Sequence, residues 1–177
     1  MIDIRPATAD DLPRIEQIYD AIHTAEEAGT ASVGWARGVY PTRATAQAAL
    51  DGGALFVLTD GGALVAAGRI DQVQVPVYAQ VPWQYAAPPE QVLVLHTLVV
   101  DPMIAGHGCG TQFVRFYARR ARALSCTVLR IDTNAANTRA RRLYARLGFR
   151  EAAIVSCTFN GIAGVSLACL EKRLDAE

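Results

Sequence analysis

The sequence carries no excess of charge: 17 basic residues balance 17 acidic ones, and Lys172 is the single lysine. A chain without net charge creates no overall field that would attract nucleic acid or an anionic membrane. We therefore expect neither of these partners.

The chain has few cysteines, and their spacing indicates neither a CxxC motif nor a zinc site. The four cysteines form no CxxC pair and have no histidine nearby at the spacing of zinc ligands, so we expect free thiols and no metal. The first residues lack the basic segment and apolar run of a signal peptide, and no stretch approaches the roughly 18 apolar residues of a membrane span. These absences predict a cytoplasmic protein.

Composition and length are those of an ordinary globular protein. Hydrophobic residues make up 51% of the chain and charged residues 19%, proportions that are usual for soluble enzymes. A chain of 177 residues can bury a core without disulfides or metals to stabilise it. We expect one domain over residues 1–177.

Hydrophobic periodicity places strands and helices along the chain. Apolar residues recur at helical spacing after Asp10, after Thr42, after a glycine-rich run at 105–111 and after Asn137. Strands are expected from alternating or continuous apolar runs at residues 2–5, 55–58, 64–70, 92–100, 128–132, 151–159 and 165–172. This order predicts an α/β chain with a mixed sheet.

Residues 72–89 contain no charged side chain, and their prolines argue against a central strand. Two interpretations remain open. The segment could be an extended edge strand followed by a surface loop, packed in a homodimer against a second subunit. Alternatively, it could be a lid that holds Tyr78, Trp83 and Tyr85 over a pocket.

The glycine-rich run lies between a strand and a helix, which is typical of a phosphate site. The first N–H groups of a helix have no intrahelical partner, and glycine lets an anion approach them. A P-loop is excluded, because Thr111 and Gln112 follow Gly110 where a lysine and a hydroxyl are required. A Rossmann loop lacks its third glycine at Thr111, although Asp132 ends the next strand at about the right distance. An NAD-type dinucleotide site therefore stays as an alternative.

A second motif follows the loop. Asn137, Ala140, Tyr144, Gly148 and Phe149 match the pattern N-x-x-A-x-x-x-Y-x-x-x-G-F at every named position. Together with a V-x-P step at residues 100–102 and the glycine run, these residues resemble the core of the GNAT superfamily of acyl-CoA-dependent N-acetyltransferases. The chain departs from the pattern at residue 105, where alanine replaces the usual arginine or glutamine and removes one side-chain contact to phosphate.

The resemblance implies a fold, a donor and a mechanism. The fold would be a mostly antiparallel sheet of about seven strands with a splayed parallel pair, flanked by about four helices. Acetyl-CoA would donate the acyl group to a primary amine, and Tyr144 would protonate the leaving thiolate. A binding module without turnover is the non-catalytic alternative. The residues implied in acyl-CoA binding are Leu98, Val99, Val100, Ala105, Gly106, His107, Gly108, Cys109, Gly110, Thr111 and Asn137.

Such a reaction requires a base, because an alkylamine with a pKa near ~10.4 is almost wholly protonated at neutral pH. The two-residue period of a strand puts His96 on the same face as Leu98, beside the implied acyl-CoA groove. A histidine there could accept the proton directly or through water. It also resembles a histidine of arylalkylamine N-acetyltransferases. A hydrogen-bonded core histidine is the alternative.

The sequence contains no motif that identifies the acceptor. Trp35, Tyr40 and Tyr85 suggest an aromatic-lined pocket for a small-molecule or peptide amine, and Arg37 could bind a carboxylate on it.

Overall fold

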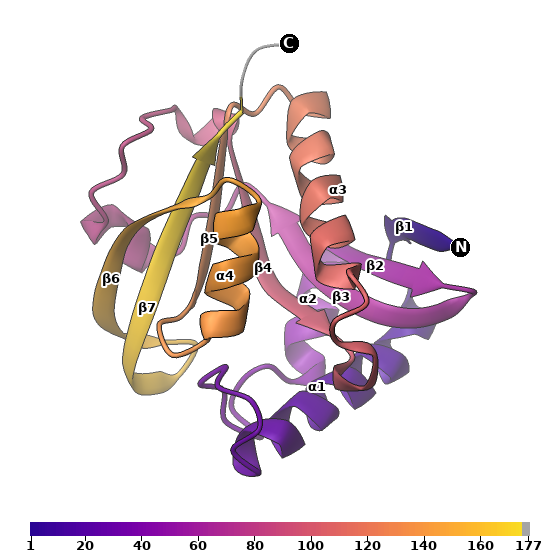
Figure 1. The fold of residues 1–177 in the computed structure, drawn as a ribbon. Helices are drawn as coiled ribbons and strands as arrows, with labels where there is room; N and C mark the ends of the chain where they lie inside the picture. The colour runs from indigo at the N-terminus through magenta and orange to yellow at the C-terminus, as the bar shows by residue number, and fades with distance from the viewer. Residues whose placement is uncertain (175–177) are drawn as a thin grey trace.

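The computed structural model describes residues 1–174, which form a seven-stranded mixed sheet with four α-helices (Figure 1). The strands follow the order β1-β2-β3-β4-β5-β7-β6, and β4–β5 is the parallel pair among antiparallel neighbours. The predicted fold class is confirmed. The strands are β1 (Ile2–Pro6), β2 (Leu55–Asp60), β3 (Ala63–Asp71), β4 (Val92–Val100), β5 (Val128–Asn134), β6 (Arg150–Phe159) and β7 (Ile162–Arg173); the helices are α1 (Leu12–Glu27), α2 (Arg43–Asp51), α3 (Cys109–Ala123) and α4 (Thr138–Arg146).

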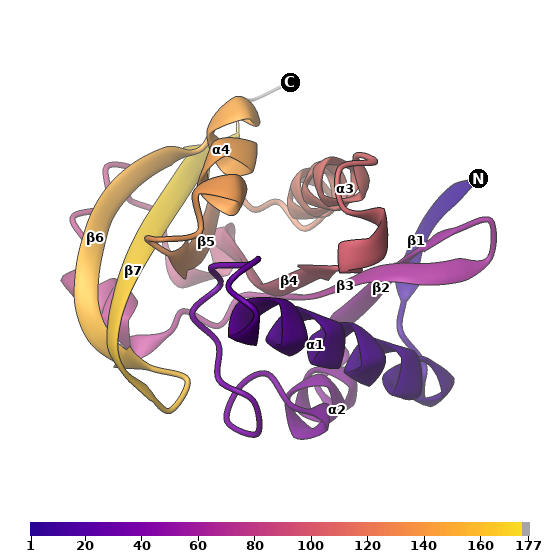
Figure 2. The same ribbon diagram turned by 60° about the horizontal axis from the view of Figure 1, so that its bottom comes forward.

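The helices lie on both faces of the strongly bent sheet (Figure 2). α1 and α2 pack against one face of β2–β4 and α3 against the other, while α4 covers β5–β7 on the α3 side. The segment between β3 and β4 covers the opposite face of β5–β7. Among residues 1–174, no helix is long and apolar enough to cross a membrane.

Local sequence signals start and end the helices where the pattern predicts. The amide of Thr42 donates to Thr45 Oγ1 at 3.0 Å before α2, and Asn137 Oδ1 accepts from the amide of Ala140 at 3.1 Å before α4. Both contacts satisfy groups that the first turn leaves unpaired. Gly148 ends α4 with φ of 85°, which glycine adopts without strain.

β4 and β5 separate at their C-terminal ends. Their pairing runs only from Val92↔Val128 to Leu95↔Ile131, although both strands continue. Beyond this point β4 pairs with β3 alone and β5 with β7 alone. The backbone groups of β4 that face β5 are therefore free near residues 98–100.

A β-bulge interrupts β4 at the same place. Arg69 of β3 pairs with His96 and Ala67 with Val99, so β4 carries one extra residue between these pairs. Thr97 has φ of 51°, a conformation that β-branched residues rarely adopt. The bulge reverses the alternation of faces, so Leu98 packs toward α3 with Leu93 and Leu95. The prediction that His96 shares a face with Leu98 is therefore wrong.

The uncharged segment between β3 and β4 is not an edge strand, as one interpretation had it. It contains two short 3-10 turns, Pro76–Gln80 and Pro89–Gln91, and Val77, Tyr78 and Val81 are buried against the sheet. The lid interpretation is also wrong for the aromatic residues, because Trp83 and Tyr85 pack against this same cluster.

Glu171 holds this segment in place. Its carboxylate is fully buried and accepts from the amides of Gln84 at 2.8 Å and Tyr85 at 3.2 Å, and it also pairs with Arg150. A buried carboxylate is tolerated only when such partners replace its hydration.

We expect Glu171→Ala to lower the free energy of unfolding by about 2 kcal/mol or more, because two amides and one cation lose their acceptor. Urea unfolding measures the difference. Glu151→Ala is the matched control, since its ion pair with Arg141 is about one-third exposed and should contribute less than ~1 kcal/mol. Equal losses in the two variants would show that Glu171 does not anchor the segment.

Candidate active site

A groove runs between α3 and α4, and we call it the α3–α4 groove. Its volume is about 610 Å³, and its walls are the free end of β4, the glycine loop, the first turn of α3 and one side of α4. All but one of the residues that the sequence implied in acyl-CoA binding line it. The exception is His107, whose amide and Nδ1 both bond the Ile104 carbonyl oxygen.

The glycine loop leaves backbone donors at the start of α3. Gly108 precedes the helix with φ of 84°, and a Cβ built at this position would meet nothing within 4 Å. The amides of Cys109, Gly110 and Thr111 belong to the first turn and have no intrahelical acceptor. The space in front of Gly108 and these amides fit an anionic ligand.

The charges along the groove have one sign. Within residues 1–174, the charged residues that line it are Arg139 and Arg146, both from α4. Neither forms an ion pair with another described residue. These arginines supply the positive charge that Ala105 lacks, and a groove of this kind suits a ligand with several phosphates.

A second cavity, the β4–β5 cavity, lies where the two strands separate. Its volume is about 550 Å³. The groove and the cavity share part of their walls, and Tyr144, Leu98, Asn137 and Trp35 belong to both. A group bound in one could therefore reach a group bound in the other at these residues.

Tyr144 lies at this junction, on the buried side of α4. Its side chain is 5% exposed and lies against Phe149, with ring centroids 6.0 Å apart. Burial raises the pKa of its phenol, and the nearby carboxylate of Asp132 adds to the effect. Within the described chain its hydroxyl donates no hydrogen bond. Tyr144 is thus a neutral proton donor without a protein acceptor.

Asn137 lines the same junction while it caps α4. Its Oδ1 is taken by the Ala140 amide, so its side-chain Nδ2 remains able to donate to a ligand.

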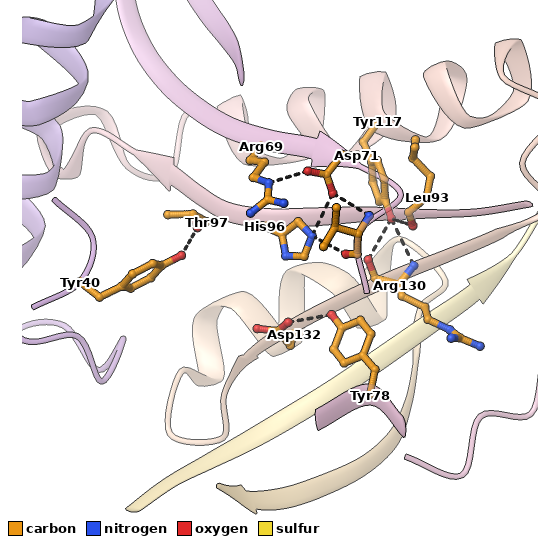
Figure 3. A network of polar contacts seen from close by, with 11 residues as sticks. Tyr40, Arg69, Asp71, Tyr78, Leu93, His96, Thr97, Tyr117, Arg130 and Asp132 are labelled. Carbon is orange, nitrogen blue, oxygen red and sulfur yellow. Dashed lines mark hydrogen bonds and ion pairs between the residues drawn. The ribbon is translucent and has the colours of Figure 1, made fainter. Parts of the chain in front are cut away.

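His96 lines the β4–β5 cavity and is held by the loop that follows β3 (Figure 3). Its Nε2 lies 3.0 Å from the Val73 carbonyl oxygen and 3.3 Å from Asp71 Oδ1. Both partners accept, so Nε2 carries the proton in these contacts, and in the neutral form of the ring Nδ1 is the nitrogen able to accept. Burial acts to raise the pKa of Asp71, but hydrogen bonds from His96, Arg69 and the Val73 amide outweigh it and hold this pKa below its usual value.

Asp132 is a cavity residue that sequence reasoning missed as a site residue. It lies near the end of β5, and Tyr78 donates to its Oδ2 at 2.7 Å. Burial raises the pKa of its carboxyl, while the bond from Tyr78 opposes this rise. The available signal in the sequence was the charged residue at the end of the expected strand 128–132.

The predicted acceptor residues divide into two groups. Trp35 and Tyr40 line the β4–β5 cavity, with their rings edge to face at 5.9 Å, and the Tyr40 hydroxyl bonds Thr97 Oγ1 beside the bulge. Arg37 and Tyr85 do not line it. Arg37 is paired on the surface with Asp20 and Glu27, and Tyr85 packs against the buried cluster of the β3–β4 segment while its amide donates to Glu171.

Residues 1–174 contain no cluster of three or more His, Cys, Asp or Glu side chains that could hold a metal ion. The dinucleotide alternative also loses its structural basis, because a doubly wound sheet is mostly parallel, whereas here only β4 and β5 are parallel among the described strands.

Comparison with known proteins agrees with this arrangement. The model of the acetyltransferase (GNAT) family matches residues 13–149. A GNAT-family acetyltransferase of Streptococcus agalactiae superposes with a TM-score of 0.81 at 20% identity, over 99% of this chain and 96% of that chain. An N-acetyltransferase of Staphylococcus aureus gives 0.71 at 20% identity, over 99% of each chain. A Salmonella typhimurium structure described as an acetyltransferase with its cofactor acetyl-CoA gives 0.69 at 19% identity, over 100% and 96%.

No curated protein sequence matches the chain. The similarity to the solved structures establishes the fold. The family match extends over most of the chain, and it includes the glycine loop, α4 and the residues that line both the α3–α4 groove and the β4–β5 cavity. The chain therefore belongs to the GNAT family of acetyltransferases.

Proposed function

We propose that the protein transfers an acetyl group from acetyl-CoA to the primary amine of a small-molecule or peptide acceptor. The observation that carries this proposal is the position of Tyr144, which lines both the α3–α4 groove and the β4–β5 cavity. A donor thioester in the groove and an amine in the cavity would meet beside its hydroxyl. Direct transfer needs such a meeting point, because the two reacting atoms must approach within about 3–3.5 Å.

Acetyl-CoA binding is supported by three features of the α3–α4 groove. The α3 amides and the open space at Gly108 suit the pyrophosphate. The unpaired edge of β4 near residues 98–100 offers backbone groups to the pantetheine amides, in the way one strand pairs with another. Arg139 and Arg146 add positive charge without a competing carboxylate in the groove lining.

The proposed chemistry is a proton transfer followed by acyl transfer. His96 Nδ1 accepts a proton from the acceptor ammonium, and the free amine attacks the thioester carbonyl carbon. As the carbon–sulfur bond breaks, Tyr144 donates its proton to the thiolate. The second proton lost by the attacking nitrogen restores Tyr144 directly or through water, so the products are an amide and free CoA.

We expect acetyl-CoA to stabilise the protein by ~2.7 kcal/mol at about 100 times its dissociation constant, with no stabilisation by NAD or ATP. Gly108→Val should reduce this shift to near zero, because the new side chain would occupy the space in front of the α3 amides. Thermal unfolding with and without each ligand measures both effects.

The matched control is Gly61→Val in the β2–β3 turn. Gly61 also has positive φ, 58°, and open space at its Cβ, so valine costs similar backbone strain of ~1–2 kcal/mol but lies outside both cavities. Loss of the acetyl-CoA shift in both variants would trace the effect to strain rather than to the ligand. Binding without thiol release from any amine would favour the non-catalytic module.

A further inference from the structure

Three polar side chains form a row across three adjacent strands at the β4–β5 cavity. Arg69 of β3 is the register partner of His96 of β4. Asp132 of β5 follows Ile131, the partner of Leu95, so it lies level with His96 where the strands begin to separate. All three line the cavity, and Figure 3 shows them in the order Arg69, His96, Asp132. A cation and a carboxylate therefore lie on either side of the proposed base.

Arg69 keeps free donors for an anion. Its Nε donates to Asp71 Oδ2 at 2.5 Å, and within the described chain neither Nη1 nor Nη2 donates to another residue. Asp71 shares its charge with His96 and the amide of Val73 as well. The guanidinium fork thus remains open on its Nη side, which is the geometry that binds a carboxylate.

Asp132 offers the opposite charge at the other end of the row. Tyr78 occupies its Oδ2, and Oδ1 has no hydrogen-bond donor among residues 1–174. An ammonium group in the cavity could donate to Oδ1 and lie beside His96 at the same time. The acceptor nitrogen would then be fixed next to its base.

We propose that the acceptor is a free amino acid, bound with its carboxylate on Arg69 and its amine between His96 and Asp132. This inference rests on the proposed acetyl transfer. Paired strands lie ~4.8 Å apart, and β5 begins to separate from β4 at this level, so the Arg69 and Asp132 backbones are at least roughly 10 Å apart. The side chains of Arg69 and Asp132 both line the cavity on either side of His96, so the carboxylate and the amine of one amino acid would occupy the space between them.

Amines without a free carboxylate would pair with only part of this row of side chains. A simple amine leaves the Nη donors of Arg69 without an anion, and a peptide N-terminus carries an amide where the carboxylate is needed. The cavity, about 550 Å³ in volume, lies within the usual range for a small ligand. The rest of the lining combines apolar residues such as Trp35, Val73 and Ile162 with uncharged polar ones such as Thr133, Asn134 and Asn160, which favours amino acids with neutral side chains.

The test compares acceptors that differ only in the carboxylate. Thiol release from acetyl-CoA is measured with L-phenylalanine, L-phenylalanine amide, phenethylamine and the dipeptide Phe-Ala, with rates corrected for the fraction of free amine. We expect kcat/KM for L-phenylalanine to exceed that for its amide about 10- to 100-fold, the value of a charged hydrogen-bonded pair. Arg69→Gln should bring this ratio close to one, mainly by raising KM for the amino acid.

Arg115→Gln is the matched control, since Arg115 is exposed on α3 and lines neither cavity; it should keep the ratio. Thermal unfolding checks that both variants fold. Equal use of amide and amino acid by the parent, or an unchanged ratio in Arg69→Gln, overturns the inference while acetyl transfer stands. Preference for Phe-Ala would point to a peptide acceptor instead. An absence of turnover with every amine, including L-alanine and L-methionine, overturns the proposed function and this inference with it.

Discussion

Replacing Tyr144 by phenylalanine is expected to lower kcat roughly 10²–10⁴-fold, the usual contribution of a positioned general acid. The ring would still pack against Phe149 and the fold would remain, because the hydroxyl donates no hydrogen bond within the described chain. Since its phenol pKa is raised by burial, Tyr144 stays protonated across the working pH range and can donate to the thiolate.

Single-turnover thiol release and the dissociation constant of acetyl-CoA separate chemistry from binding in this variant. The dissociation constant should change little, because the lost proton is needed only in the transition state. Tyr117→Phe is an informative comparison: its hydroxyl bonds the carbonyl oxygens of Leu93 and Arg130, so it should lose stability and keep its rate per folded molecule. Normal turnover by Tyr144→Phe would reduce Tyr144 to a packing residue.

Replacing His96, the proposed base, is expected to have the second large effect on activity. We expect His96→Ala to lower kcat/KM by about 10²-fold or more and to abolish the rising limb of its pH profile. The sign follows from the chemistry: the base works only when unprotonated, so kcat/KM increases with pH until the base has lost its proton. Asp71→Asn should slow transfer less than His96→Ala, because Asp71 contacts Nε2 and its loss leaves Nδ1 of His96 in the cavity.

Asp132 is the competing base, and the same profile distinguishes it. Burial raises its carboxyl pKa, so as a base it would also produce activity that rises with pH. Loss of the limb in Asp132→Asn and its survival in His96→Ala would assign the proton transfer to Asp132. If His96 is structural, His96→Ala destabilises the protein to urea through a cavity and an unpaired carbonyl, while its pH profile stays as in the parent.

Local patterns accounted for much of the fold. The helical spacing after Asn137, its cap and the glycine at 148 all involve groups within a few residues of one another, and the structure has α4 as the sequence indicates. The glycine loop is likewise read from consecutive residues. Such features depend on backbone sterics and on unpaired groups at helix ends, which act over one or two turns.

Predictions from the sequence failed where segments far apart in the chain pack against each other. Alternation along β4 fails at Thr97, because a β-branched residue at positive φ is unfavourable by itself and occurs only where surrounding contacts hold it. One such contact is the Tyr40 hydroxyl, 57 residues away. One of the two interpretations placed residues 72–89 in an edge strand and a surface loop, yet apolar packing and the buried carboxylate of Glu171 hold them on the face of β5–β7.

The amino-acid sequence by itself determined the family, the order of elements, the phosphate-type loop and the position of Tyr144 within its motif. Only the tertiary structure decided which arginine faces the β4–β5 cavity. Arg37 and Arg69 are equivalent as residue types, but Arg37 is held on the surface by Asp20 and Glu27, whereas Arg69 lies level with His96. Strand order, the separation of β4 from β5 and the bulge are set by packing between segments far apart in sequence, and these features bring Asp132 into the cavity.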